Sequence, residues 1–544
     1  MWETHRSQKM VAQLRRFFVF HPFLFAIYSV LSVYARNASQ VPVGWIWRPL
    51  VLILWITSLV YVFCLKTSKN RDYAGFVSTL VVNWLFMGQL YRFLLERSPF
   101  WRTPIGGVCA FLVITVPIGF LASKRTWNTL SISNHKLITT LLNVVSISLV
   151  AVPLWTTIAV FYHGNLQLQL VKEQRASVQA TLTKSSTTVP DIYVIIVDGY
   201  GRADMLQDLY GYDNSGLVTS LKEKGFYVAD QATSNYPQTQ LSVSSLLNLN
   251  YLNAHLGKLG PTDDRTGLYE LVQHPTLRKL LVNQGYKFVA LPSTTLVTQI
   301  RDADTYFNVT GSDINEFETF LLSSTVMNIA NEAWGMKLPV MGYELHRRYI
   351  LFSLQELHEI PNMPGPKFVF AHIMLPHPPF IFDANGKFVP PNRPYMMWDA
   401  SLFPGTTKEY QKGFTDQVTF LNQQLIRIIS DILAKSSTPP IIILQGDHGP
   451  GAFFDVQSLQ NNSCLAERYS ILEAYYFPDH DYRSLYPSIT PVNSFRVILN
   501  QYFRAHLGLL ADKNYYATWG SPYVYTDVTD QVPLSCNTSA DKMN

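Results

Sequence analysis

Polar residues that could bind a metal follow short apolar segments in the second half of the chain. The segments Ile192–Val197, Phe368–His372 and Ile441–Leu444 are apolar at nearly every position, which is typical of central strands in a parallel sheet covered by helices on both faces. Asp198 follows the first segment and His372 ends the second. Because the carboxyl ends of parallel strands open into one crevice, we expect these side chains to meet.

The third segment runs directly into Gly446-Asp447-His448-Gly449. An Asp-His pair between glycines is, on its own, most typical of a turn. After a buried strand, however, a carboxylate is costly unless a cation compensates its charge. The same reasoning applies to Asp198, whose alternative role is to cap the next helix. Asp198, Asp447 and His448 together predict a site for a divalent metal, with zinc, manganese and magnesium all compatible.

A candidate nucleophile lies between the first two strands. The segment from Ser234 to Asn248 is rich in hydroxyl groups and predicts a loop that ends at Thr239, followed by a small helix. Taken alone, such a residue is as often a helix cap as a reactive group. Beside a divalent cation its hydroxyl would be acidified, and backbone amides at the helix start would hold its phosphorylated form. Thr239 is therefore predicted to be both cap and nucleophile.

Three further residues could support this chemistry. His377 lies in Pro376-His377-Pro378. It is either a residue of a rigid loop, or its imidazole points toward the crevice. In the crevice it could donate a proton to a phosphoryl oxygen or to a leaving group. His372 and Arg202, each close to a strand end, are candidates for contacting the substrate or for supporting the metal ligands.

Helical patterns separate the predicted strands. They cover Gly216–Lys224, Pro275–Gln284 and Tyr410–Ala434. The alternation of strands and helices indicates a three-layer α/β fold.

The first part of the chain has a different character. Of the 544 residues, 48% are hydrophobic and only 15% are charged, too apolar for an ordinary soluble protein and too polar for one that spans a membrane throughout. Five apolar stretches are each long enough to cross a bilayer, at about 18 to 25 residues. They are Phe17–Ala35, Trp45–Leu65, Ala74–Leu95, Ile105–Ala122 and Leu137–Tyr162.

Basic residues predict the orientation of these spans. Clusters of Lys and Arg precede the first span and lie in the second and fourth connections, and they fall on one side of the membrane if the N-terminus is cytoplasmic. The clusters are Arg6, Lys9, Arg15 and Arg16; Lys66, Lys69 and Arg71; and Lys124, Arg125 and Lys136. They largely explain the net charge of +5, so no nucleic-acid partner is expected. The first span shows no cleavage site and is interpreted as a retained anchor.

These observations predict three parts. Residues 1–163 form a five-helix transmembrane domain, 164–190 an exposed linker rich in Gln, Lys, Ser and Thr, and 191–544 an extracytoplasmic catalytic domain. With five spans, the protein is expected to be a multi-pass protein of the plasma (inner) membrane. Cys464 and Cys536 lie in the exported part and either form a disulfide there or remain free thiols.

Taken together, the motifs resemble those of the alkaline phosphatase/sulfatase superfamily. The resemblance is greatest to its membrane-anchored branch, which includes lipoteichoic acid synthases and phosphoethanolamine transferases. It rests on the Val-Asp-Gly strand end, Thr-x-x-Ser-x-x-Ser-Leu-Leu from Thr239, Pro-His-Pro-Pro-Phe at 376–380, Gly-Asp-His-Gly at 446–449, and the segment Asn493–Phe503. It implies that Asp198, Thr239, Asp447 and His448 surround one metal, that Thr239 takes a phosphoryl group, and that His377 contacts the substrate.

Two departures narrow the expected function. The Cys/Ser-x-Pro-x-Arg signature of sulfatases does not fit Ser234-Asn-Tyr-Pro-Gln, and the catalytic domain lacks the multiple cysteines typical of phosphoethanolamine transferases. The leading hypothesis is a transferase that moves a phospho-alcohol group from a phospholipid donor to an envelope glycan or lipid. A hydrolase of exported phosphate or sulfate esters is the alternative, followed by an inactive relative with a role in envelope assembly.

Overall fold

The computed structural model describes residues 18–38, 41, 43–178, 180–183, 189–309, 314–334, 342–393, 395–459, 463–532 and 536. The chain divides into two compact units, one of Met1–His163 with Gly311–Val340 and one of Gly164–Thr310 with Met341–Asn544. Phe17 and the basic residues before it, which carry part of the predicted orientation, lie outside the described residues.

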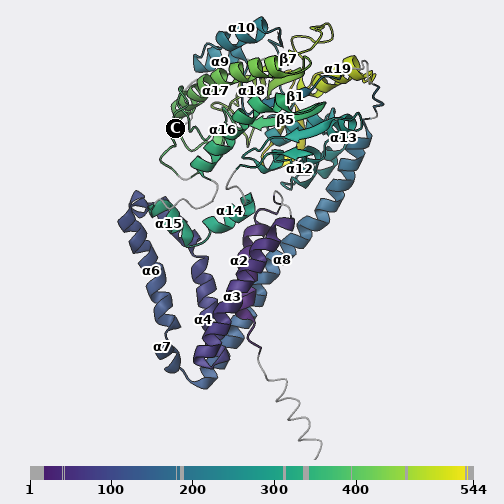
Figure 1. Cartoon of the computed structure of the whole chain (residues 1–544). Helices are drawn as coiled ribbons and strands as arrows, with labels where there is room; N and C mark the ends of the chain where they lie inside the picture. The colour runs from purple at the N-terminus through teal and green to yellow at the C-terminus, as the bar shows by residue number, and fades with distance from the viewer. Residues whose placement is uncertain are drawn as a thin grey trace, which may run out of the picture. The chain divides into compact units, whose positions relative to one another are not determined.

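The first unit is built from helices. They are α2 (His21–Ala35), α3 (Trp47–Ser68), α4 (Arg71–Leu85), α5 (Gly88–Arg97), α6 (Pro104–Ala122), α7 (Lys124–Asn128) and the first part of α8 (Ile132–Ala176). Figure 1 shows α2, α3 and α4 running side by side. Their sequences are apolar around most of the helix, as expected for segments surrounded by lipid.

Three of the predicted spans coincide with helices that are long and apolar enough to cross a membrane. These helical segments are Val43–Ser68, Pro104–Asn128 and Ile132–Ala176. Helix α2 has 15 residues, fewer than the roughly 20 that a span usually needs. The predicted span Ala74–Leu95 is divided between α4 and α5, because Phe86 and Met87 interrupt the helix. Five spans therefore stay a prediction.

The first unit also contains two short helices from the second half of the sequence, α14 (Glu316–Ser323) and α15 (Met327–Trp334). The backbone N–H of Gly88 donates to the Ser324 carbonyl at 3.0 Å, and that of Val326 donates to the Leu85 carbonyl at 2.8 Å. Arg48 forms an ion pair with Glu318. These contacts hold the inserted helices against the helical unit near the ends of α4 and α5.

The second unit is built around a seven-stranded mixed sheet with the order β2-β7-β6-β1-β5-β3-β4. The central strands β6, β1, β5 and β3 are parallel, as is β4, whereas β7 and β2 are antiparallel to their neighbours. The strands are β1 (Ile192–Val197), β2 (Tyr227–Val228), β3 (Lys287–Ala290), β4 (Thr305–Tyr306), β5 (Lys367–Ile373), β6 (Ile441–Gly446) and β7 (Glu473–Tyr476). The three strands predicted from the sequence are thus the three central ones.

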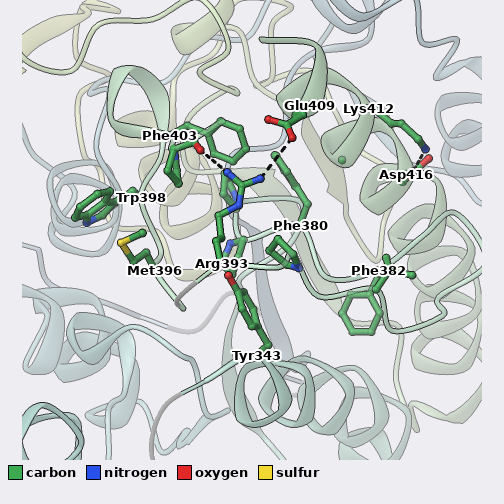
Figure 2. A pocket seen from close by; sticks show the side chains of 16 residues that line it. Tyr343, Phe380, Phe382, Arg393, Met396, Trp398, Phe403, Glu409, Lys412 and Asp416 are labelled. Atoms are coloured by element: carbon green, nitrogen blue, oxygen red, sulfur yellow. Dashed lines mark hydrogen bonds and ion pairs between the residues drawn. The ribbon is translucent and has the colours of Figure 1, made fainter. Parts of the chain in front are cut away.

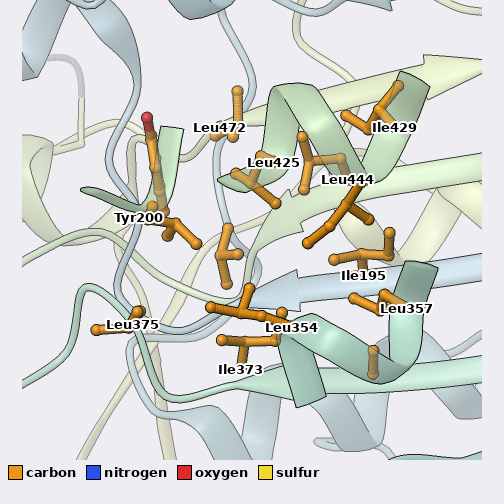
Figure 3. Packing of buried hydrophobic residues seen from close by; sticks show 14 of the residues in the cluster. Ile195, Tyr200, Leu354, Leu357, Ile373, Leu375, Leu425, Ile429, Leu444 and Leu472 are labelled. Carbon is orange, nitrogen blue, oxygen red and sulfur yellow. The ribbon is translucent and has the colours of Figure 1, made fainter. Parts of the chain in front are cut away.

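Helices cover both faces of the sheet, and each face has its own apolar core. Ile195, Leu444 and Ile373 point from the strands toward α16 (Tyr343–Glu359) and α17 (Thr407–Lys435), as Figure 3 shows. The opposite face packs mainly against α11 (Thr239–Asn248), α13 (Thr276–Val282) and α19 (Pro491–Phe503). Every residue of β1 is buried, which explains why its sequence is apolar on both faces.

Four further helices and a β-hairpin complete this unit. They are α9 (Ala203–Tyr210), α10 (Ser215–Glu223), α12 (Thr266–Gln273), α18 (Leu465–Tyr469) and a hairpin of β8 (Tyr515–Thr518) and β9 (Ser521–Asp527). Cys464 and Cys536 form a disulfide, the first of the two alternatives left open by the sequence. Cys64 and Cys109 are free.

Candidate metal centre and active site

The carboxyl ends of β1 and β6 bring the predicted metal ligands together. Asp198, Asp447 and His448 each offer one ligand atom, and these atoms lie within 4.8 Å of one another. All three residues are at most 1% exposed. Gly199 has a φ of +76°, a conformation that favours glycine, and its N–H donates to Asp447 Oδ1 at 3.1 Å.

The unused atoms of these residues indicate a cation. Within the described part of the chain, Asp198 Oδ1 and Asp447 Oδ2 are buried without a hydrogen-bond partner. The Nδ1 atom of His448 lies 2.9 Å from the Gly449 carbonyl, which fixes the proton there and leaves Nε2 to act as an acceptor or a ligand. This Nε2 is 3.6 Å from Asp198 and 3.5 Å from Asp447. Two carboxylates and an imidazole with such unused atoms fit a divalent metal ion.

Burial and charge act in opposite directions on Asp198. Burial would raise the pKa of its carboxyl, but His377, His372 and His448 lower it, and the net pKa lies below the usual range. Burial, assisted by Arg468, lowers the pKa of His448. Both shifts favour the protonation states that metal ligands need. Asp198 is then an ionised carboxylate and His448 a neutral imidazole.

Thr239 stands directly beside the metal ligands. Its Oγ1 is 3.4 Å from Asp198 Oδ2 and 3.3 Å from His448 Nε2. The prediction that Thr239 also caps its helix is wrong, since Thr239 is the first residue of α11 and Gln238 is the N-cap. The Gln238 side chain makes no capping bond because it donates to the Ala517 carbonyl and accepts from Arg265. The Thr239 hydroxyl is therefore not used by the helix.

The two predicted histidines have different surroundings. His372, near the end of β5, has Nδ1 2.8 Å from Thr298 Oγ1 and Nε2 3.2 Å from Asp198 Oδ2. It is buried, and its Nε2 lies against a candidate metal ligand. His377 instead lines the cavity at Thr239, where its backbone N–H donates to the Asp198 carbonyl at 3.1 Å.

Arg202 is not brought into this site in the described structure. Its guanidinium forms a bidentate ion pair with Asp204 and donates to the Ala232 carbonyl at 2.9 Å. That Arg202 contacts the substrate or supports the metal ligands stays a prediction.

Sequence reasoning missed a buried ion pair beside the metal ligands. Arg468 donates to Asp399 at 2.6 Å, to the Pro237 carbonyl at 2.8 Å and to His448 Nε2 at 3.3 Å. Asp399 also lies 3.9 Å from His377 Nε2. Arg468 belongs to α18, whose five residues are all buried. A charged arginine in such a segment was the one sequence feature that could have indicated a buried ion pair. Asp399 lies in an irregular loop with no pattern to mark it.

A cavity of about 210 Å³ opens onto these groups. Thr239, His377, His448 and Asp198 line it, and Trp398 and Trp519 form part of its wall. Such a concave site, with a few converging polar groups among apolar ones, is typical of an active site. The arrangement combines a hydroxyl that faces the cavity, a candidate metal centre and a histidine on the cavity wall.

Comparison with known proteins gives structural matches alone. No family model matches the sequence, and neither does any curated protein. The zinc complex of the C-terminal periplasmic domain of EcEptC from Escherichia coli is 13% identical, with 65% of this chain and 96% of that chain covered and a TM-score of 0.42. The integral membrane lipooligosaccharide phosphoethanolamine transferase A from Neisseria meningitidis is 13% identical over 85% of this chain and 89% of that chain, with a TM-score of 0.35. A 2-O GAG sulfatase is 12% identical over 61% of this chain and 73% of that chain, with a TM-score of 0.36.

Proposed function

We propose that this protein is a membrane-anchored, metal-dependent phosphotransferase of the alkaline phosphatase/sulfatase superfamily. It moves a phospho-alcohol group, such as phosphoglycerol or phosphoethanolamine, from a phospholipid to an envelope glycan or lipid. The observation that supports this most is the position of the Thr239 hydroxyl, at 3.3–3.4 Å from both His448 and Asp198 in an open cavity.

Asp198, Thr239, Asp447 and His448 would hold the cation, whether zinc, manganese or magnesium. When bound, a divalent cation acidifies the hydroxyl and neutralises charge on a phosphoryl group. The unpartnered oxygens of Asp198 and Asp447 support this assignment, because a buried carboxylate without a counter-charge is unfavourable.

In the first step, Thr239 Oγ1 loses its proton to solvent and bonds to phosphorus. The bond from phosphorus to the lipid alcohol oxygen breaks, and His377 would donate a proton to that oxygen. In the second step, a hydroxyl of the acceptor bonds to phosphorus, the bond to Thr239 breaks, and the threonine is protonated again. The first backbone amides of α11 would donate hydrogen bonds to the negatively charged phosphothreonine.

The membrane part would hold the catalytic domain close to its lipid substrate. Phospholipid head groups lie at the membrane surface, so anchoring keeps the catalytic domain near its donor. We extend the proposal to a cytoplasmic N-terminus, five spans within 1–163 and an extracytoplasmic catalytic domain at 191–544.

The proposal is tested by detecting the covalent intermediate on Thr239 by mass spectrometry. The full-length chain is placed in vesicles of phosphatidylethanolamine and phosphatidylglycerol with isotope-labelled head groups, and its intact mass and peptides are measured. We expect an adduct on Thr239 whose mass identifies the transferred group. Thr239→Ala should abolish the adduct and turnover while the metal remains bound and the chain folded.

A neighbouring hydroxyl provides the control. Ser242 lies on the same helix and is 1% exposed, and Ser242→Ala should still form the adduct. Turnover at full rate by Thr239→Ala, or an adduct on another residue, would overturn the proposal. Transfer of the labelled group to water alone would identify a hydrolase.

A further inference from the structure

A second cavity adjoins the one at Thr239. Its volume is about 240 Å³. Trp398 lines both cavities, and consecutive residues of one loop divide between them, with His377 in the first and Pro378 in the second. A substrate whose phosphoryl group lies at Thr239 would therefore place its next chemical group in this second cavity, which we term the aromatic pocket.

Aromatic rings form part of the wall of the aromatic pocket. Phe380 and Phe403 have ring centroids 5.5 Å apart, and Trp398 is 52% exposed. Figure 2 shows Arg393 in the middle of these rings, with Trp398 on one side and Lys412 on the other. The exposed Trp398 ring offers a flat apolar surface at the junction of the two cavities.

Charged groups of both signs complete the pocket. Arg393 lies 3.8 Å from Glu409 and donates to the Pro404 carbonyl. Lys412 pairs with Asp416 at 2.7 Å. The pocket thus presents donors and acceptors side by side around an apolar floor.

This combination distinguishes between possible occupants. A hydrocarbon chain would remove water from the Arg393–Glu409 and Lys412–Asp416 ion pairs, and the desolvation of such pairs is unfavourable. A lone phosphate would meet the carboxylates of Glu409 and Asp416. A neutral sugar ring uses both kinds of surface, since its C–H face packs on aromatic rings and its hydroxyls both donate and accept hydrogen bonds.

The size of the pocket agrees with a single ring. Its volume of about 240 Å³ lies below the range of roughly 300–1,000 Å³ that is usual for drug-sized ligands. We infer that the aromatic pocket is the acceptor subsite and holds one neutral pyranose ring of a glycan, next to the phosphoryl group at Thr239. The inference rests on the proposed function for its role in transfer, while the binding of a sugar can be tested without turnover.

The binding test uses the full-length chain in phospholipid nanodiscs with N-acetylglucosamine and glucose as probes. Saturation-transfer NMR detects a sugar in contact with the protein. Val389 lines the pocket and is 43% exposed, so Val389→Trp would fill the cavity without disturbing a buried contact. We expect a clear signal for the wild type and at least a fivefold loss in Val389→Trp.

The matched control is Val524→Trp. Val524 is 46% exposed and lies on β9, and neither of the two described cavities includes it. Its signal should equal that of the wild type. A wild type without a signal, or a signal unchanged by Val389→Trp, would overturn the inference. Displacement of the sugar by dihexanoylphosphatidylethanolamine, competing for the same pocket, would assign the pocket to the donor lipid instead.

A second measurement links the pocket to transfer. Arg393→Gln keeps a polar side chain but removes the charge, and it should lower transfer to an oligosaccharide at least tenfold while adduct formation on Thr239 stays within about twofold. Equal loss of both steps would contradict an acceptor subsite. Absence of the Thr239 adduct in the wild type, with sugar binding retained, would overturn the proposed function and leave the sugar site standing.

Discussion

Buried carboxylates lie at both ends of strand β1, and they differ in whether the chain provides a counter-charge. At the amino end, Asp191 accepts hydrogen bonds from both the backbone N–H and the ammonium group of Lys367, at 3.0 and 2.5 Å. At the carboxyl end, Asp198 and Asp447 each keep a buried oxygen without a hydrogen-bond partner among the described residues. The same pair of strands, β1 and β5, supplies Asp191 and Lys367 at one end and Asp198 and His372 at the other.

The difference separates a structural ion pair from a candidate metal site. A buried carboxylate needs a counter-charge, and Lys367 provides it where the chain only has to fold. At the carboxyl end the nearest guanidinium, that of Arg468, is bonded to Asp399 at 2.6 Å. The remaining carboxylate atoms are therefore left for a cation from outside the chain.

The largest expected effect comes from neutralising the carboxyl end. Asp447→Asn should lower turnover by about 10³-fold or more, equivalent to about 4 kcal/mol. In the presence of a chelator, the same change should raise the free energy of unfolding, because it removes a buried charge that lacks a partner. Turnover and urea unfolding of the full chain, with and without chelator, measure the two effects.

The surface substitution Asp230→Asn, at an exposed position, should change neither quantity. A destabilised Asp447→Asn in chelator would show that the carboxyl end is a structural polar cluster like the amino end.

The next effect in size is expected at the amino end, with the opposite sign for stability. Lys367→Met should lower the free energy of unfolding by about 3–5 kcal/mol, since Asp191 would remain buried and unpaired. Turnover per folded molecule should stay within about twofold, because the pair lies at the far end of the strands. Hydrogen exchange of the β1 amides in the full chain measures the loss.

A double substitution completes this test. Asp191→Asn together with Lys367→Met removes both charges and should recover most of the lost stability. If Lys367→Met alone left the exchange of β1 unchanged, the ion pair would not be the counter-charge that stabilises this end of the sheet.

The comparison also shows which features the sequence could predict. Strands β1, β5 and β6 were predicted because complete burial makes them apolar on both faces, and the polar residues that end them, Asp198 and Asp447, stand out against that background. Asp399 could not be predicted, since its approach to Arg468 depends on the path of an irregular loop. Local patterns carry no information about such a contact.

Two features of the chain's organisation were hidden for similar reasons. The Gln-rich composition after His163 predicts an exposed linker, yet α8 continues to Ala176 and buries Gln167 and Gln174. Their amides donate to the carbonyls of Asp264 and Tyr251, partners that lie far away in the sequence. Helices α14 and α15 likewise join the helical unit through residues more than two hundred positions away.

The smallest expected effect is a change in the free energy of unfolding with pH, and it comes from a third buried carboxyl group. Glu473 on β7 faces Gln445 on β6, and in the described structure none of the four side-chain polar atoms of this pair has a hydrogen-bond partner. Burial raises the pKa of Glu473 from 4.5 to about 8, although the hydroxyls of Tyr475 and Ser494 lower it. Without a cation or an ammonium group beside it, this carboxyl group is expected to stay protonated when folded.

The sign of the pH dependence follows from this raised pKa. Between pH 5 and 7.5 the folded chain holds a proton at Glu473 that the unfolded chain has lost, so the free energy of unfolding falls by about 1.4 kcal/mol for each pH unit gained. Glu473→Gln should remove this part of the slope, as measured by urea unfolding of the full chain at several pH values, whereas Glu223→Gln at an exposed position should retain it. An unchanged slope in Glu473→Gln would mean that Glu473 is ionised and has a counter-charge, as Asp191 has in Lys367.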